Sequence, residues 1–323
     1  AEIGNNHEGD FELAKQMIHQ AAEAGADVVK FQTFRVSDFV TCSERERYNQ
    51  LAKYEFSYDQ FKELYTIATG EGLMFLSTPL DLKSVDALDG FVEAFKIASG
   101  DNTFWPLIAH VASKGKPVIL STGMAEDGEI AQALKVLKRH GKSEAIEDWV
   151  VLLHCVSCYP TPDDKVNLLS IDYLKDKFGL TVGYSDHTLG TTACIAAVAR
   201  GARVIEKHFT YSKKDKDFMD HRISADPVEF KHIVEEIRLV ETSLGEYKNE
   251  MMPCEEKVKD MARRSIAAKR FIEKGKMIEE NDLTWLRPAS GFRVGDENLV
   301  IGRRASRNIE KGEIIRAKDL EQN

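Results

Sequence analysis

The chain has 323 residues, of which 43% are hydrophobic and 30% are charged, as in ordinary globular proteins, and this length suggests about two domains. The net charge of −9 argues against non-specific binding to nucleic acid, which needs a basic surface. No apolar run approaches the roughly 18 residues of a membrane-spanning helix, and no signal peptide is visible. The sequence opens inside an apolar stretch, "AEIG", so we expect residues upstream of it.

The sequence contains five scattered cysteines, Cys42, Cys155, Cys158, Cys194 and Cys254. An odd, scattered set does not fit a disulfide framework and predicts a reducing, cytoplasmic location. Cys155 and Cys158 form a single C-x-x-C pair, whereas zinc sites usually need a second pair and redox pairs begin a helix. Because Tyr159 and Pro160 follow instead, we expect neither metal nor redox chemistry there.

Eight short β-rich runs alternate with amphipathic stretches, such as Phe11–Ala24 and Ile130–His140, over the first three quarters of the chain. The runs are nearly continuous in apolar residues, as in a parallel sheet covered on both faces. Turns containing glycine, such as "EAGADVV" and "ARGARVI", precede several runs, where a helix usually ends. The predicted strands are residues 1–4, 27–34, 73–79, 94–100, 117–123, 150–157, 180–186 and 203–209.

Eight β/α units in about 250 residues are typical of a TIM (β/α)8 barrel. A doubly wound sheet is the alternative, but it usually has fewer strands and a glycine-rich phosphate loop after the first one. No β/α turn of this chain contains G-x-G-x-x-G. The sequence therefore favours an α/β protein whose TIM barrel occupies residues 1–248.

A different pattern begins after a charged linker that we place at residues 249–262. The stretch "IEKGKMIEENDL" (Ile272–Leu283) recurs 37 residues later as "IEKGEIIRAKDL" (Ile309–Leu320). Turn-forming "EKG" segments and alternating apolar residues predict a small, mostly β domain over residues 263–323. Two copies of one motif predict pseudo-twofold packing, because a solenoid needs at least three.

Polar residues follow or end every predicted strand, and in a TIM barrel that end carries the active site. Ser, Thr and Asp before a helix are capping residues first, which is a sufficient explanation for Thr122 and Asp81. In chain order the strands carry or lead into Glu2, Asn5, Asn6, His7, Lys30, Gln32, Ser77, Thr78, Lys96, Ser99, Asp101, Ser121, Thr122, His154, Ser157, Tyr159, Ser185, Asp186, His187, Glu206, Lys207 and His208.

Capping does not explain Lys30 and Lys96, which lie inside apolar strands. A lysine is almost never fully buried unless it is paired, and two lysines facing one cavity repel unless an anion separates them. With several Ser and Thr hydroxyls nearby, they predict a phosphate or carboxylate site.

His187 and His208 end neighbouring strands, so their imidazoles can converge. Each histidine alone is better explained as a core or capping residue. As a pair beside Glu2 and Glu206 they predict a divalent metal site, with water and a substrate oxygen at the remaining positions.

The sequence resembles the sialic acid synthase family, which includes N-acetylneuraminate synthase and the bacterial legionaminate and pseudaminate synthases. The resemblance covers essentially the whole chain. Its motifs are "AEIGNNHEGD", "AGADVVKFQTF", "FLSTP", "FKIASGD", "PVILSTGM", "LLHCVSCYPTP", "GYSDHT" and "IEKHFT". The tail resembles the family's C-terminal antifreeze-like (SAF) domain, which is similar to type III antifreeze protein.

The resemblance implies an enzyme that condenses phosphoenolpyruvate with an N-acylated hexosamine such as N-acetylmannosamine and releases phosphate. His187 and His208 would hold Mn or Mg, with Mn favoured, and Glu2, Glu206 and Asp101 would act in catalysis. Residues implied to bind phosphoenolpyruvate are Lys30, Thr78, Lys96, Ser99, Ser121, Ser157 and Ser185. Residues implied to bind the sugar are Gln32, Tyr159, Asp220 and Arg287.

The resemblance further implies a domain-swapped homodimer, in which Arg287 of one subunit reaches the sugar in the barrel of the other. Asp101 stands where some relatives have Glu, and Ser157 stands where some have Asn. The segment after the second strand, "SDFVTCSERERYNQLAKYEF", matches no branch, so the hexosamine stays open. Asp186 is expected to orient His187.

Three alternatives stay open on the residues alone. A Schiff-base aldolase would use Lys30 or Lys96 as nucleophile. A synthase of octulosonic or heptulosonic acids would share the phosphoenolpyruvate chemistry but not the repeated tail. A non-catalytic carbohydrate-binding or ice-binding protein would use the tail itself.

Overall fold

The chain forms two units, Ala1–Gly245 and Glu246–Asn323, in a computed structural model that describes residues 1–214, 216 and 219–322. None of the helices in these described ranges is both long enough and apolar enough to cross a membrane.

Every strand predicted for the first unit is present, and each is shorter than the predicted run. All pairings between neighbouring strands are parallel, in two sheets with the orders β1-β2-β3 and β4-β5-β6-β7-β8. The strands are β1 (Glu2–Gly4), β2 (Val28–Thr33), β3 (Met74–Pro79), β4 (Phe95–Ile97), β5 (Val118–Ser121), β6 (Val150–Cys155), β7 (Thr181–Asp186) and β8 (Ile205–Lys207).

The two sheets are joined at the edge between β8 and β1. Glu2 forms an isolated parallel bridge with His208, and the Phe209 N–H donates to the Glu2 carbonyl at 2.7 Å. At the other edge β3 lies in contact with β4. The strands thus follow one another in sequence order, whereas a doubly wound sheet reverses direction in its middle. The α/β class with parallel strands is confirmed, and the closed barrel stays a prediction.

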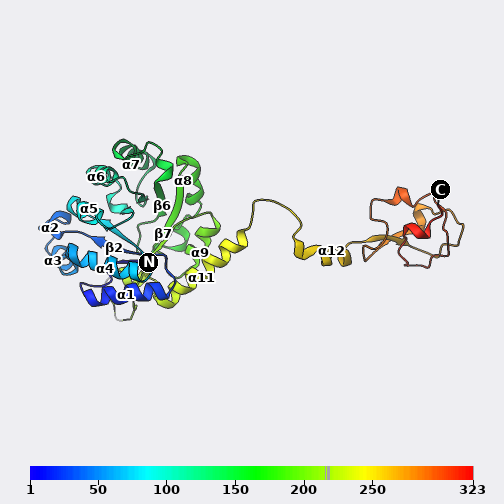
Figure 1. Ribbon diagram of the computed structural model, residues 1–323, viewed down its shortest axis with the longest axis horizontal. Helices are drawn as coiled ribbons and strands as arrows, with labels where there is room; N and C mark the ends of the chain where they lie inside the picture. The colour runs from blue at the N-terminus through cyan, green and yellow to red at the C-terminus, as the bar shows by residue number, and fades with distance from the viewer. Residues whose placement is uncertain (215, 217–218, 323) are drawn as a thin grey trace. The chain divides into compact units, whose positions relative to one another are not determined.

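Helices lie around the strands of the first unit (Figure 1). Helix α1 shows how the sequence forms them: the Asp10 carboxylate accepts the Leu13 N–H at its start, and its buried face repeats every three to four residues. The helices are α1 (Phe11–Glu23), α2 (Val36–Phe39), α3 (Arg45–Tyr54), α4 (Tyr58–Gly70), α5 (Leu82–Asp89), α6 (Trp105–Ser113), α7 (Asp127–His140), α8 (Ser170–Phe178), α9 (Thr192–Ala199), α10 (Met219–Ile223) and α11 (Pro227–Leu244).

Of the two capping residues suggested by the sequence, one is confirmed. Asp81 caps α5 by accepting the Ser84 N–H at 2.8 Å. Thr122 does not cap α7, whose N-cap is Glu126. Its hydroxyl donates to the Leu153 carbonyl at 3.0 Å instead, because the strand end and the helix start are separated by a further turn.

Strand β2 shows how packing and chemistry are divided between its two faces. Val29 and Phe31 are fully buried in the hydrophobic core, where the Phe31 ring stacks on Phe75 at 5.6 Å. Lys30 and Gln32 alternate with them and line a cavity. Because side chains of a strand point alternately to opposite faces, the apolar residues anchor the strand while the polar ones face the cavity.

The second unit contains helix α12 (Glu256–Ala262) and an antiparallel pair of strands, β9 (Ser265–Ala268) and β10 (Leu283–Leu286). The remainder is short 3-10 turns and isolated bridges, so regular strand is scarcer than the sequence suggested. Its core cluster includes Ile266, Leu283 and Ile309.

The sequence repeat corresponds to a structural repeat. Ile272 and Ile309, the first residues of the two copies, pair with each other in an antiparallel bridge. In each copy a buried aspartate accepts an arginine Nε–H: Asp282 from Arg270 at 2.5 Å, and Asp319 from Arg307 at 2.7 Å. The pairing of the two copies is what pseudo-twofold packing requires.

Gly183 in β7 is expected to be intolerant of any side chain. A methyl group there would collide with the Val204 carbonyl and with Leu153 Cδ2. We expect Gly183→Ala to lower the free energy of unfolding by about 1–3 kcal/mol, measured by urea denaturation. Gly128 in α7 has open space at the same position, so Gly128→Ala is the control. Equal stability of the two variants would contradict the tight packing of β7.

Candidate active site

A cavity of about 500 Å³ opens at the carboxyl ends of the strands of the first unit. Of the sixteen site residues that the family resemblance implies, fourteen line it, and Asp220 and Arg287 do not. The predicted residues that line it are Glu2, Lys30, Gln32, Thr78, Lys96, Ser99, Asp101, Ser121, Ser157, Tyr159, Ser185, His187, Glu206 and His208. Strand ends far apart in the sequence therefore contribute to one cavity.

Two lysines and two glutamates form a buried charge cluster in this cavity. Lys30 Nζ lies 2.6 Å from Glu2 Oε2 and 3.6 Å from Glu206 Oε2. Lys96 Nζ lies 3.5 Å from Glu206 Oε1. Each lysine side chain is less than a tenth exposed. Glu206 thus stands between the two ammonium groups.

This arrangement corrects the charge argument made from the sequence. Two lysines were expected to need a bound anion between them, and Glu206 supplies one from within the protein. Burial opposes ionisation of Glu206, but Lys30 and Lys96 outweigh it and hold the pKa of this carboxyl well below its usual range. The lysines by themselves therefore do not demand a ligand.

The two lysines differ in their electrostatic surroundings. Burial alone would lower the pKa of each ammonium group. For Lys30, the carboxylates of Glu2 and Glu206 more than compensate and raise the pKa. Lys96 has fewer compensating charges, so burial lowers its pKa. Lys96 is the group that gains most from an additional anion.

Two hydroxyls of the cavity are free to donate a hydrogen bond to such an anion. Ser121 Oγ and Ser157 Oγ are buried, and neither has a hydrogen-bond partner among the described residues. A buried polar group without a partner costs free energy, and a ligand often relieves that cost. Gly123 lies against the Ser157 hydroxyl and against Ser99: a methyl group there would collide with Ser157 Oγ and Ser99 Oγ.

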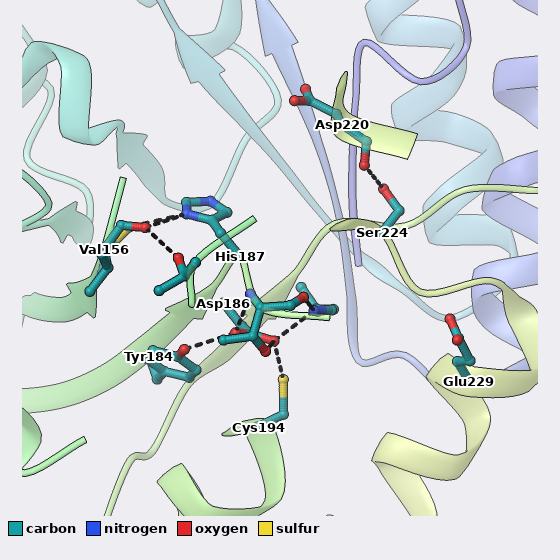
Figure 2. Close-up of polar contacts among 12 residues, drawn as sticks. Val156, Tyr184, Asp186, His187, Cys194, Asp220, Ser224 and Glu229 are labelled. Atoms are coloured by element: carbon teal, nitrogen blue, oxygen red, sulfur yellow. Dashed lines mark hydrogen bonds and ion pairs between the residues drawn. The ribbon is translucent and has the colours of Figure 1, made fainter. Parts of the chain in front are cut away.

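The imidazoles of His187 and His208 converge, with ring centroids 5.4 Å apart. His187 Nδ1 donates to the Val156 carbonyl at 2.9 Å, as Figure 2 shows. This bond leaves the lone pair of His187 Nε2 free. His208 Nδ1 is buried without a described partner, and burial beside His187 and Lys30 holds the pKa of His208 well below its usual range.

These observations fit an open metal site with two protein ligands. Both imidazoles are able to present a lone pair, which is what binding of a divalent transition metal requires. Within the described part of the chain, no group of three or more His, Cys, Asp or Glu is arranged to hold a metal ion. The remaining ligands would have to come from water and substrate.

The residues implied to contact a sugar are only partly brought together. Gln32 lies in a chain of hydrogen bonds, accepting from Asn5 Nδ2 at 2.9 Å and donating to Glu2 Oε1 at 3.2 Å. The Tyr159 ring packs on His187 with centroids 4.2 Å apart. Asp220 lies on α10 outside the cavity lining, and burial raises its pKa to about 6. Arg287 belongs to the second unit.

Several residues of the cavity were not identified from the sequence. Cys155 is buried with its sulfur 3.8 Å from His187 Nδ1. The signal was available, because Cys155 pairs in register with Ser185, so both point to the same face. Phe39 and Arg47 also line the cavity. They lie on α2 and α3, two helices after β2, and the pattern of strands in the sequence does not predict where these helices lie. The C-x-x-C pair forms no disulfide.

Comparison with known proteins assigns the chain to a family. Residues 17–249 match the NeuB family, and residues 263–321 match the SAF domain. The chain belongs to the NeuB family. An uncharacterised protein of Methanocaldococcus jannaschii is 47% identical to it, over 99% of this chain and 93% of that protein. The N,N'-diacetyllegionaminic acid synthase of Campylobacter jejuni is 40% identical, over 98% of each chain.

A solved structure agrees with this assignment. The N-acetylneuraminic acid (sialic acid) synthetase of Leptospira borgpetersenii, determined in complex with citrate, is 36% identical to this NeuB-family chain. The two structures superpose with a TM-score of 0.74, covering 80% of this chain and 88% of the other. The resemblance identified from the sequence motifs is thereby confirmed.

Asp101 is expected to make stability depend on pH. Burial raises the pKa of its carboxyl from 3.8 to about 6. The stabilising contribution of the protonated form is therefore complete below pH 3.8 and is lost as the pH rises through about 6. Asp101→Asn, which cannot ionise, should raise the Tm relative to the parent protein more at pH 8 than at pH 5. Thermal denaturation at both values checks this, and an equal gain at both contradicts it.

Proposed function

We propose that this protein is a nonulosonate synthase, which condenses phosphoenolpyruvate with an N-acylated hexosamine and releases phosphate. We also propose that the two parallel sheets of the first unit close into a TIM barrel. The observation that carries the activity is the buried pair of lysines with the unpartnered hydroxyls of Ser121 and Ser157, in a member of the NeuB family.

The cavity suits a small substrate that carries both a phosphate and a carboxylate. One anionic group would be held by Lys96 and by the hydroxyls of Ser121 and Ser157. Burial lowers the pKa of Lys96, so this ammonium group gains from a bound anion. Lys30 and Thr78, already 3.2 Å apart, would hold the other, with Ser99 and Ser185 close by. Anionic oxygens that accept from these donors would form charge-assisted hydrogen bonds.

Substrate binding would change what Glu206 can do. In the structure both lysines stabilise its ionised form, so at neutral pH it can accept a proton but not donate one. An anion that engages the lysine protons competes with Glu206 and makes the carboxylate more basic. Glu206, with Glu2 beside it, would then take the proton of the water that attacks C2 of phosphoenolpyruvate.

The bond changes follow from the two substrates. C3 of phosphoenolpyruvate attacks the aldehyde carbon of the open-chain sugar, and water adds to the cationic C2. The resulting tetrahedral hemiketal phosphate breaks its C–O bond to phosphate and leaves a 2-keto acid. Asp101, with a pKa of about 6, is able to exchange a proton with the new sugar hydroxyl near neutral pH.

His187 and His208 would hold a divalent metal, Mn in preference to Mg, and such an ion would supply Lewis-acid activation of the aldehyde oxygen. Gln32, Tyr159 and Asp220 would contact the sugar. The identity to a diacetyllegionaminic acid synthase supports a diacetamido sugar as acceptor. A domain-swapped homodimer, in which Arg287 of one subunit reaches the N-acyl group bound in the other, would complete the site.

Phosphate release tests the proposal. We expect the purified protein with Mn²⁺ to release phosphate from phosphoenolpyruvate in the presence of a diacetamido-hexose or N-acetylmannosamine. A panel that also contains a pentose phosphate and a tetrose phosphate distinguishes the octulosonic and heptulosonic alternatives, because phosphoenolpyruvate supplies three carbons of the product and the acceptor supplies the rest. If none of the N-acyl hexosamines in the panel supports phosphate release, the proposal is contradicted.

The lowered pKa of Lys96 also favours a Schiff-base aldolase, because a neutral amine is the nucleophile in that chemistry. Borohydride with pyruvate would then trap a covalent adduct on Lys96, detected by peptide mass spectrometry. We expect no adduct.

We further expect His187→Ala and His208→Ala to lose metal-dependent turnover. Full activity of the parent protein in the presence of a chelator would contradict this prediction.

The hydroxyls of Ser121 and Ser157 are expected to act through substrate binding. Each of Ser121→Ala and Ser157→Ala should raise the KM for phosphoenolpyruvate about ten-fold, the effect of one hydrogen bond to a charged group. Ser113 is the matched control, because its hydroxyl bonds only to the His110 carbonyl of its own helix among the described residues. Steady-state kinetics decide, and an unchanged KM in both variants would remove these hydroxyls from the site.

A further inference from the structure

A buried ion pair lies directly behind the two imidazoles. Lys207 Nζ is 2.7 Å from Asp186 Oδ2, and the two side chains are 2% and 0% exposed. Asp186 immediately precedes His187, and Lys207 immediately precedes His208. Neither Asp186 nor Lys207 lines the cavity.

The register of β7 and β8 explains why the pair sits there. Ser185 is paired with Glu206, and Asp186 with Lys207. The first of these pairs faces the cavity, where Ser185 Oγ donates to Glu206 Oε1 at 2.9 Å. The second faces the opposite side, because side chains alternate along a strand. One residue later, both histidines face the cavity again.

The carboxylate of Asp186 is held by five donors (Figure 2). Oδ1 accepts from the Tyr184 hydroxyl at 2.8 Å and from the Thr188 N–H at 2.9 Å. Oδ2 accepts from Lys207 Nζ at 2.7 Å, from the Thr188 hydroxyl at 3.2 Å and from Cys194 Sγ at 3.3 Å. Nothing in this set includes the His187 ring, so Asp186 does not orient the imidazole directly, as the sequence had suggested.

The pair instead holds the backbone on both sides of His187. Asp186 precedes His187 and binds the Thr188 N–H after it, while Lys207 Nζ donates to the Thr188 carbonyl at 2.6 Å. The same lysine side chain begins one residue before His208. A single ion pair therefore joins the backbone segments that carry both imidazoles.

We propose that Asp186 and Lys207 are positioning residues, which fix the separation of His187 and His208 and thereby set the affinity of the site for a divalent metal. This inference rests on the metal site of the proposed function. Groups that orient metal ligands from behind commonly change metal affinity 10- to 100-fold when they are replaced. The pair also balances its own charge, so that the Lys207 ammonium does not repel a cation at the imidazoles.

Mn²⁺ binding to the metal-free full-length protein tests this inference without any enzymatic turnover. Titration followed by the electron paramagnetic resonance of free Mn²⁺ gives the dissociation constant. We expect Asp186→Asn to weaken binding about 10- to 100-fold. Asp282→Asn is the matched control, since Asp282 is also a fully buried aspartate that accepts from a lysine, at 2.8 Å, but lies in the second unit. We expect it to leave Mn²⁺ affinity unchanged.

Two further variants separate positioning from a contribution to stability. Tyr184→Phe removes only one donor to Asp186 and should weaken Mn²⁺ binding in the same direction, by less. Asp186→Leu combined with Lys207→Met removes both charges, a change that buried pairs often tolerate without loss of stability. If the pair only stabilises the fold, the folded double variant will bind Mn²⁺ like the parent, and the inference is overturned.

The outcomes also distinguish this inference from the proposed function. A parent protein that binds no Mn²⁺, or whose binding survives His187→Ala, overturns the metal site and the inference with it. A parent that binds Mn²⁺ through its histidines, beside a folded Asp186→Asn variant of equal affinity, overturns the inference alone.

Discussion

In the first unit, the placement of polar side chains in the cavity depends on the alternation of side chains along parallel strands that end at a common edge. On β2, Val29 and Phe31 pack into the core while Lys30 and Gln32 face the cavity. On β7 and β8 the same alternation separates the Asp186–Lys207 pair from the Ser185–Glu206 pair. A slip of one residue would exchange the two faces and place the catalytic candidates in the core. The apolar half of each strand therefore determines where the polar half points.

Charge in the cavity is balanced before any ligand arrives. Glu206 lies within 3.6 Å of both lysines, and Glu2 lies 2.6 Å from Lys30. This balance allows the site to be buried without a bound anion, since an unpaired lysine at that depth would be costly. It also couples substrate binding to the basicity of Glu206, because a bound anion and the carboxylate compete for the same ammonium protons.

The sequence predicted the strands and most of the cavity because both follow local patterns. Apolar runs followed by polar residues located all eight strands of the first unit, and the parallel arrangement brought their ends together. Cys155 was not predicted in the cavity because its position there depends on its register with Ser185, which the C-x-x-C spacing does not specify. Arg47 and Phe39 were missed because the connection after β2 has no periodic pattern that fixes its path.

By itself the sequence determined the α/β class, the repeat in the second unit, the family and the residue types at each strand end. These follow from periodicity and from motifs that are contiguous in the chain. Only the tertiary structure decided which charges neutralise one another, that Asp186 pairs with Lys207 and not with the His187 ring, and which hydroxyls lack partners. Such pairings depend on distances of a few ångströms between residues far apart in the chain, and spacing along the sequence does not specify them.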